Sequence, residues 1–373
     1  MSEEQYFPGL EGVIAGETGV GTVEGGLLYR GYPIEELARD GRFLEVAYLL
    51  LHDELPNQEH LADFQSILAE SCDVDASIIR FVGEIPLHAG AMDVLRTGIS
   101  ALGHFDPQND ENSRSANIGK TIRLLARIPV LIAARYRQGR GLPLVEPNAE
   151  LSFAANLLHQ ITGSEPSPLQ ERAMDVSLIL YAEHEFNAST FTARVVTSTE
   201  SDLYSAITAA VGALKGPLHG GANERVMQVL EEVGSAANAE RWVRNALAEK
   251  RRIMGFGHRV YKTGDPRATI LREYCRELAD EAGDTELEEI ADTIERVVRE
   301  EKGLPPNLDW PSARLYHYLG LEVELYTPLF VASRVVGWAA HAIEQSENNR
   351  LIRPRSRYIG PPQRKFMPLA ERG

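Results

Sequence analysis

The sequence predicts an all-α fold, and three observations lead to that prediction. Apolar residues recur at helical spacing in successive blocks along the 373 residues of the chain. Turns rich in glycine, proline and asparagine separate these blocks. Strand signals are confined to residues 13–30, and the sequence has no fixed repeat period. We therefore expect a large helical protein with a small N-terminal β-hairpin.

The hairpin is expected at residues 13–30, which are rich in glycine and β-branched residues and turn at residues 24–26. Helical spacing begins after Pro33 and breaks at Gly41. Pro129 should kink or split a long helix, because it lacks an amide hydrogen and crowds the preceding turn. The helical blocks of this half cover residues 34–51, 61–68, 92–102, 118–136, 154–161, 173–181 and 203–214.

Helical spacing continues through the second half of the chain. The blocks there cover residues 222–233, 242–250, 266–282, 287–301, 311–319 and 329–344. The last block contains Arg334 and His341 and is too short for a bilayer, so it predicts a packed helix and no membrane span. The tail that follows, IRPRSRYIGPPQRKF, is basic and rich in proline, and we expect it to be extended.

Composition excludes several classes of function. A formal net charge of -16 disfavours nonspecific binding to nucleic acid, which needs a basic surface. Cys72 and Cys275 lie far apart and form no CxxC pair, so neither a disulfide framework nor a zinc knuckle is expected. The acidic N-terminus lacks the basic and apolar regions of a signal peptide. A cytoplasmic protein is expected.

Three apparent ligand motifs fail on inspection. Gly119-Lys120-Thr121 resembles the end of a P-loop, but Arg114 occupies the position of its first glycine. The GxG segments at residues 19–21 and 255–257 have Glu24 and Val260 where a dinucleotide-binding turn needs its third glycine. His184-Glu185 begins like a zinc-protease helix, yet Ala188 stands where the second histidine is required. We expect no metal site and no nucleotide cofactor.

Four polar segments remain as candidate sites, and each has a purely structural alternative. His184 can interact with the last carbonyls of a helix, or it can bind a ligand. His219, close to a helix start, should stay neutral and can donate to an oxyanion. Asp309 fits a helix N-cap, or a base tuned by the apolar ring of Trp310. The segments are HEFNAST (184–190), KGPLHGGAN (215–223), GFGHRVYKTGDPR (255–267) and PPNLDWPS (305–312).

The segment at residues 255–267 indicates an anionic substrate. Its glycines permit a close approach of the backbone, and His258 can exchange a proton near neutral pH. Arg259, Lys262 and Arg267 suit the recognition of carboxylate or phosphate groups.

In this order and spacing, the four segments resemble the citrate synthase family. The resemblance runs from PGLEGV near the N-terminus through YRGYPIEELA to RPRSRYIG in the tail. It implies an almost wholly helical, cytoplasmic homodimer of the tricarboxylic acid cycle. It also implies a large domain formed by residues 1–219 and 321–373, and a small mobile domain formed by residues 220–320.

The resemblance implies that His219, His258 and Asp309 are catalytic. Asp309 would remove a proton from the methyl group of acetyl-CoA, while neutral His219 hydrogen-bonds the thioester oxygen. His258 would polarise the ketone of oxaloacetate. Hydrolysis of citryl-CoA then releases citrate and CoA. The enzyme would be an acyl-CoA:oxaloacetate acyltransferase that uses the CoA thioester as substrate, with no cofactor and no metal.

The same resemblance implies residues that bind the two substrates. His184, Arg267 and Arg334 would bind oxaloacetate together with Arg353, which the family contributes across the dimer interface. An anionic ligand would also explain a charged Arg334 within an apolar helix. The CoA phosphates have as candidates Lys250, Arg251, Arg252, Arg259 and Lys262, for which solvated surface is the alternative.

Two other functions remain open. Leu308, Trp310 and Pro311 depart from the residues that the family commonly has around the aspartate, and they can reshape the acyl end of the pocket. Use of propionyl-CoA, giving 2-methylcitrate, is therefore an alternative. A catalytically silent helical scaffold is a more remote one, since the three catalytic residues implied by the resemblance are intact.

Overall fold

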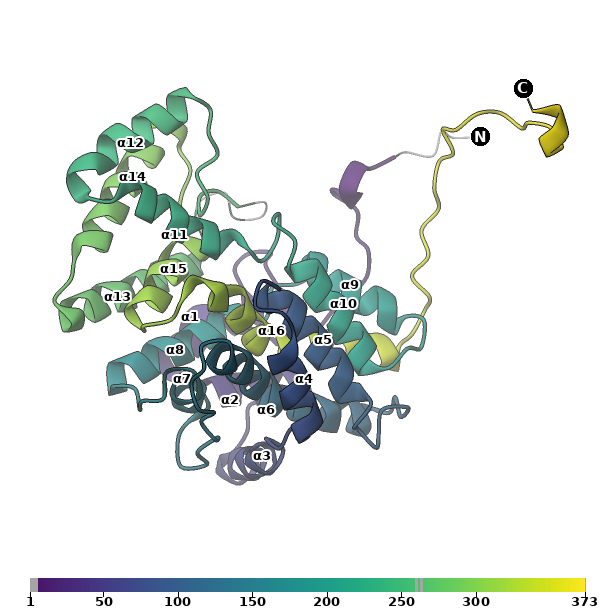
Figure 1. Cartoon of the computed structure of the whole chain (residues 1–373), viewed down its shortest axis with the longest axis horizontal. Coiled ribbons are helices and arrows are strands. Elements are labelled where there is room, and N and C mark those ends of the chain that lie inside the picture. The colour runs from purple at the N-terminus through teal and green to yellow at the C-terminus, as the bar shows by residue number, and fades with distance from the viewer. Residues whose placement is uncertain (1–5, 259–260, 262–263, 373) are drawn as a thin grey trace.

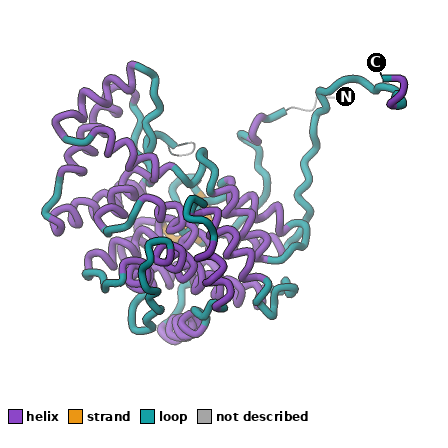
Figure 2. The backbone as a smooth tube through the Cα atoms, in the orientation of Figure 1, coloured by secondary structure: helices purple, strands orange, loops and turns teal. Residues whose placement is uncertain are grey.

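A computed structural model describes residues 6–258, 261 and 264–372 of the chain. Within these residues it contains sixteen α-helices and one small sheet, so the predicted all-α class is confirmed (Figures 1 and 2). Arg259 and Lys262, two of the predicted CoA contacts, lie outside the described residues.

The N-terminal sheet follows a short 3-10 turn, η1 (Pro8–Leu10). Strands β1 (Gly21–Thr22) and β2 (Leu28–Tyr29) form the predicted hairpin, and β3 (Tyr32–Pro33) adds a third antiparallel strand. Tyr29 is fully buried, and its hydroxyl donates a hydrogen bond to the backbone oxygen of Glu183 at 2.9 Å. The sheet is thereby fixed to the segment that carries His184.

Ten helices form the first part of the body. They are α1 (Ile34–Asp40), α2 (Phe43–His52), α3 (Gln58–Glu70), α4 (Ala76–Glu84), α5 (Ala91–Gly103), α6 (Arg114–Gln138), α7 (Phe153–Thr162), α8 (Pro168–Tyr181), α9 (Ala188–Thr197) and α10 (Leu203–Leu214). Helix α6 is not split at Pro129 and runs continuously through it. Helices α4 and α9 were not predicted.

The helices α11 to α15 pack mainly on one another, and Figure 1 shows them together at the upper left of the molecule. They are α11 (Ala222–Val233), α12 (Ala236–Ala248), α13 (Pro266–Ala282), α14 (Glu286–Lys302) and α15 (Asp309–Tyr318). The 3-10 turn η2 (Val323–Leu325) then leads into α16 (Tyr326–Glu347).

Helix α16 is the central helix of the body. It contacts α2, α6, α8, α9 and α10, and its residues are almost all buried, including Arg334 and His341. None of the helices in the described residues is long and apolar enough to span a membrane.

The tail after α16 is extended and exposed, as predicted. It runs away from the body (Figure 1) and ends in η3 (Leu369–Glu371). Large apolar side chains along it, such as Tyr358 and Ile359, are exposed in the single chain.

Candidate active site

Two of the predicted histidines lie next to each other. The ring centroids of His184, after α8, and His258, before α13, are 5.3 Å apart. Tyr261 contacts both: its hydroxyl lies 3.0 Å from Nε2 of His184, and its backbone N–H donates to Nδ1 of His258. Among the described residues, the ring of His184 hydrogen-bonds Tyr261 and no backbone carbonyl of α8. Burial lowers the pKa of His184 well below its usual range, and Arg267 and Arg334 act in the same direction.

His219 is held as a neutral imidazole with a defined tautomer. Its Nε2 lies 2.8 Å from Oγ of Ser189 and 3.3 Å from the backbone N–H of Ser189. The N–H can only donate, so Nε2 accepts and the proton of the neutral ring lies on Nδ1. Burial, assisted by Arg334, lowers the pKa of His219 to about 4. The lowered pKa favours the neutral form that the sequence predicts, and burial and Arg334 are its causes.

Asp309 is the first residue of α15 and not its cap, so the N-cap interpretation is wrong. Its backbone N–H instead donates to Oδ1 of Asn307 at 3.1 Å. This arrangement leaves the Asp309 carboxylate for other partners. Its Oδ1 accepts a hydrogen bond from the Tyr181 hydroxyl at 3.1 Å, and that hydroxyl also lies 2.8 Å from Oγ of Ser312.

The Asp309 carboxyl titrates near neutral pH. Burial raises its pKa to about 6, while the Tyr181 hydroxyl and Arg267 partly oppose the rise. Solvent reaches part of the residue, but the protein around the carboxyl still desolvates it enough to raise its pKa. Near pH 7 the group is mostly ionised and is still basic enough to take up a proton.

Arg267 is held by a carboxylate that the sequence did not single out. Asp265 caps α13 and forms two hydrogen bonds to the guanidinium of Arg267, from Nε at 2.9 Å and Nη2 at 2.8 Å. Its Oδ2 also accepts from the backbone N–H of Leu308 at 3.1 Å. One buried carboxylate therefore links the position of Arg267 to the segment that carries Asp309.

Arg334 is 1% exposed in the middle of α16. Its Nε donates to the backbone oxygen of Tyr181, and its guanidinium lies 4.7 Å from the centre of the Phe330 ring. Burial lowers the pKa of Arg334 to about 10, and Glu183 is the largest influence in the opposite direction. The side chain therefore remains cationic at neutral pH.

Backbone hydrogen bonds hold the segment before His258 against the segment before Asp309. The N–H of Gly257 donates to the oxygen of Pro305 at 2.8 Å, and the N–H of Asn307 donates to the oxygen of Gly255 at 2.9 Å. Gly255 has a φ of +87°, and a Cβ there would lie 2.9 Å from the Trp310 ring. Only glycine fits this close approach.

Comparison with known proteins agrees with this geometry. The family model "Citrate synthase, C-terminal domain" matches residues 9–355. The chain belongs to the citrate synthase family. It is 48% identical over 366 residues to citrate synthase 2 of Bacillus subtilis, covering 98% of both chains. It is 44% identical over 374 residues to 2-methylcitrate synthase 2 of Corynebacterium glutamicum, covering 98% of this chain and 97% of that one.

A solved structure of the family has the same fold. It is the ternary complex of carboxymethyl coenzyme A and oxaloacetate with citrate synthase from Thermoplasma acidophilum. The TM-score is 0.93 at 34% identity, and the match covers 99% of this chain and 100% of that one.

The remaining candidate CoA residues of this citrate synthase family member are surface side chains. Lys250, Arg251 and Arg252 are exposed at the end of α12. Arg251 forms an ion pair with Glu232 at 2.7 Å and lies 5.2 Å from the centre of the Trp242 ring. Its charge is already partly balanced within the protein.

Arg353 is not part of the cluster within the single chain. It lies exposed in the extended tail. The contacts and charge effects described above instead relate His184, His219, His258, Arg267, Asp309 and Arg334 to one another.

Trp310 is buried among helices of the second half of the chain. It is fully buried, its Nε1 donates to Glu295 at 2.9 Å, and its ring centroid lies 4.7 Å from that of Phe256. The unusual residue after Asp309 therefore packs into the core of helices α11–α15.

Sequence reasoning missed Tyr181, Ser189, Tyr261 and Asp265. Tyr181 falls in the apolar stripe of α8, where a tyrosine is typically a core residue. Asp265 had a usable signal, since an aspartate directly before a proline is typical of a helix start.

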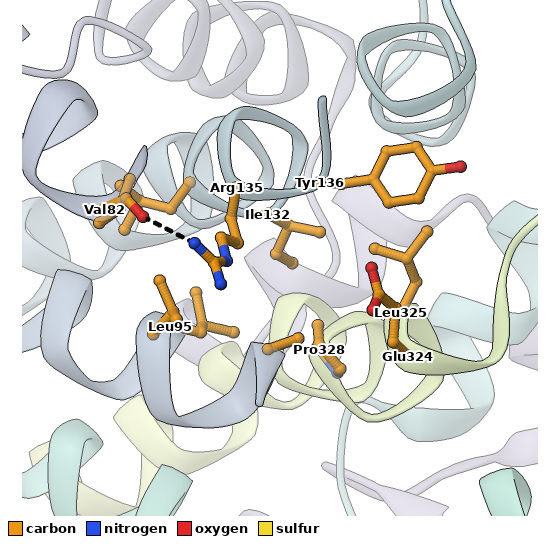
Figure 3. A pocket seen from close by; sticks show the side chains of 11 residues that line it. Val82, Leu95, Ile132, Arg135, Tyr136, Glu324, Leu325 and Pro328 are labelled. Carbon is orange, nitrogen blue, oxygen red and sulfur yellow. Dashed lines mark hydrogen bonds between the residues drawn. The ribbon is translucent and has the colours of Figure 1, made fainter. Parts of the chain in front are cut away.

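A small apolar pocket lies elsewhere in the molecule. It lies between α4, α5, α6 and the start of α16, and Figure 3 shows Val82, Leu95, Ile132 and Pro328 around it. Its volume is about 20 Å³, room for one water molecule. None of the candidate site residues lines it.

The described residues contain no group of three or more His, Cys, Asp or Glu side chains that could hold a metal ion. The arrangement instead offers a carboxylate, neutral imidazoles and two buried arginines.

Proposed function

We propose that this protein condenses acetyl-CoA with oxaloacetate and hydrolyses the resulting citryl-CoA to citrate and CoA. The observation that carries the proposal is the Asp309 carboxyl, whose pKa is raised to about 6. The methyl group of a thioester is weakly acidic, so its removal as a proton needs a desolvated base and preorganised donors for the enolate oxygen. Asp309 provides such a base.

His219 supplies the donor for the enolate oxygen. Its Nε2 is occupied by Ser189, so Nδ1–H is the group that hydrogen-bonds the thioester oxygen. A neutral donor suits this role because it stabilises the developing charge without a full proton transfer. His258 polarises the ketone of oxaloacetate and helps to protonate the new alkoxide.

Oxaloacetate is a dianion, and the cluster contains cations to match it. Arg267 and Arg334 bind its carboxylates, and His184 hydrogen-bonds the ligand from the segment between α8 and α9. Arg353 of a second copy completes the site in a homodimer. The exposed, extended tail that carries Arg353 is consistent with an arm that reaches a partner.

The active site forms where two domains meet. Residues 1–219 and 321–373 contribute His184, His219 and Arg334, and residues 220–320 contribute His258, Arg267 and Asp309. Closure of the smaller domain after oxaloacetate binds then brings the base to the acyl-CoA and excludes water. The phosphates of CoA meet Lys250, Arg251, Arg252, Arg259 and Lys262. We place the protein in the cytoplasm and assign no metal or organic cofactor to the reaction.

A second candidate function is 2-methylcitrate synthesis from propionyl-CoA. The 44% identity to a relative of that name favours it, as does the departure from common family residues at Leu308 and Pro311. Against it, the Trp310 side chain packs into the core. We therefore do not expect it to line the pocket that holds the acyl group.

The kinetic comparison of the two acyl-CoA substrates decides between these functions. CoA release is followed by a thiol reagent with acetyl-CoA or propionyl-CoA, each with and without oxaloacetate. We expect release to require oxaloacetate and kcat/KM to be higher for acetyl-CoA. A higher kcat/KM for propionyl-CoA establishes the second function.

A silent scaffold predicts a different result. Such a protein has no reason to bind the keto acid, so oxaloacetate would leave the melting temperature unchanged. We expect oxaloacetate to raise it.

A further inference from the structure

We propose that Glu183 is a positioning residue for oxaloacetate binding, which fixes the His184 segment on α16 and supplies the buried negative charge that balances Arg334. The inference rests on the proposed function of the site. Glu183 lies between Tyr181 and His184 in the sequence, and it is 0% exposed.

Three successive contacts hold the segment before His184 along one face of α16. The backbone oxygen of Tyr181 accepts from Nε of Arg334. The backbone of Ala182 lies against Gly337, where a Cβ would be 2.2 Å from the Ala182 oxygen. Residues 334, 337 and 341 are spaced by three and four positions and therefore share a helix face.

The third contact is made by the Glu183 carboxylate. Its Oε1 lies 3.0 Å from Nε2 of His341 and also accepts from the backbone N–H of Glu185. Nδ1 of His341 lies 3.0 Å from an Nη1 of Arg194, which can only donate. His341 therefore carries its hydrogen on Nε2 and donates it to Glu183, so the orientation of the carboxylate is defined.

The second carboxylate oxygen faces α16 one turn from Arg334. Oε2 of Glu183 is buried and has no hydrogen-bond partner among the described residues. It would lie 2.7 Å from a Cβ at position 337, so the absence of a side chain there allows the carboxylate to approach the helix.

The two buried arginines are balanced in different ways. Asp265 occupies Nε and Nη2 of Arg267 with two direct hydrogen bonds. Arg334 uses only Nε, on Tyr181, and no described residue accepts a hydrogen bond from its terminal nitrogens. Glu183 is the largest influence that favours the charged form of Arg334. It can thus stabilise the cation while the two-pronged end of the guanidinium remains available to a carboxylate ligand.

Two substitutions separate charge from shape. Glu183→Gln keeps the shape and the bond from His341 but removes the charge, whereas Glu183→Asp keeps the charge and shortens the side chain. Glu344→Gln is the matched control. Glu344 accepts a hydrogen bond from Arg194 at the other end of the same polar network, away from Arg334. The dissociation constant of oxaloacetate is measured by titration calorimetry without acyl-CoA, and the steady-state kinetics are measured separately.

We expect Glu183→Gln to weaken oxaloacetate binding at least about tenfold and Glu183→Asp to weaken it less. KM for oxaloacetate should rise while kcat at saturation stays within about threefold. The affinity of Glu344→Gln should remain within about twofold of the wild-type value.

Unchanged affinity in Glu183→Gln, or a greater loss in Glu183→Asp than in Glu183→Gln, overturns the inference. If circular dichroism shows that Glu183→Gln is unfolded, Glu183→Asp decides alone: affinity within about fivefold supports the inference and a larger loss contradicts it. Failure of the wild-type protein to bind oxaloacetate is a different result, because it refutes the proposed function itself.

Discussion

At the scale of single residues, desolvation sets the chemistry of the site. Burial raises the pKa of Asp309 and lowers the pKa values of His184 and His219. Each shift favours the neutral form, and together they give a carboxyl that exchanges protons near pH 6 beside imidazoles that stay uncharged.

The pH dependence of the reaction follows from Asp309. The base acts only when ionised, so kcat/KM for acyl-CoA should fall about tenfold per unit as the pH drops below about 6. His219, with a pKa of about 4, stays neutral over most of this range and adds no second fall to the pH–rate profile. A profile that is flat from pH 7 to pH 5 contradicts the assignment of the base.

Tyr181 helps to set the pH at which kcat/KM begins to fall. Its hydroxyl stabilises the ionised carboxylate, so Tyr181→Phe should raise the pKa of Asp309 and shift the acidic limb to higher pH. Tyr316→Phe is the control, because this buried hydroxyl pairs with Ser177 instead. Equal shifts in the two variants would show that the hydrogen bond to Asp309 is not the cause.

Asp309 also costs stability. A raised folded-state pKa means that the folded protein holds this proton more tightly than the unfolded chain does, so the contribution of Asp309 to stability falls as the pH rises from about 3.8 to about 6. Asp309→Asn should abolish turnover yet stabilise the fold by up to about 3 kcal/mol at pH 7. The gain should vanish near pH 4 in thermal melts. A destabilised variant at pH 7 contradicts the proposed cost.

At the scale of elements, the close approach of α16 to residues 181–183 is the critical contact. Gly337→Ala places a Cβ 2.2 Å from the Ala182 oxygen, and because that neighbour is backbone, it cannot rotate away. We expect a loss of about 1–3 kcal/mol in the free energy of unfolding, measured by urea titration, and weaker oxaloacetate binding.

Gly119→Ala in α6 is the matched control. The nearest atoms there are the flexible ends of Arg123 and Gln108, at 3.3 and 3.6 Å. Its stability should stay within about 1 kcal/mol of wild type. A similar loss in both variants would show that the effect is not specific to α16.

Helices with a clear apolar stripe could be predicted from the sequence, whereas α4 and α9 could not. Helices such as α10 and α13 carry long apolar stripes and clear caps. Helix α4 buries only Ile78 and Val82, which is too short a stripe to stand out. Helix α9 begins within the polar HEFNAST segment, where the side chain of Asn187 caps it. Small polar residues can either cap a helix or bind a ligand, so the sequence alone did not reveal that a helix starts here.

At the scale of the whole molecule, the sequence placed the site residues in separate segments, and their meeting depends on tertiary packing. The contact of Tyr181 with Asp309 joins α8 to α15 across 128 positions, and no local pattern encodes it. The resemblance to a family supplied the site residues because a family motif carries that tertiary information.

The dimer can be tested by mixing two inactive proteins. If each site needs Arg353 from its partner, refolding Arg353→Ala together with Asp309→Ala at equal amounts gives heterodimers with one complete site. Half of the dimers are then heterodimers, so about a quarter of the wild-type turnover should return. No recovery, with heterodimers present by mass spectrometry, places Arg353 outside the partner's site.

The most direct test of the whole account is CoA release from acetyl-CoA by the wild-type and Asp309→Ala proteins, each with and without oxaloacetate. We predict rapid release only by the wild type with oxaloacetate, and almost none by a folded Asp309→Ala protein. Release that does not need oxaloacetate, or that survives the loss of Asp309, would contradict the account.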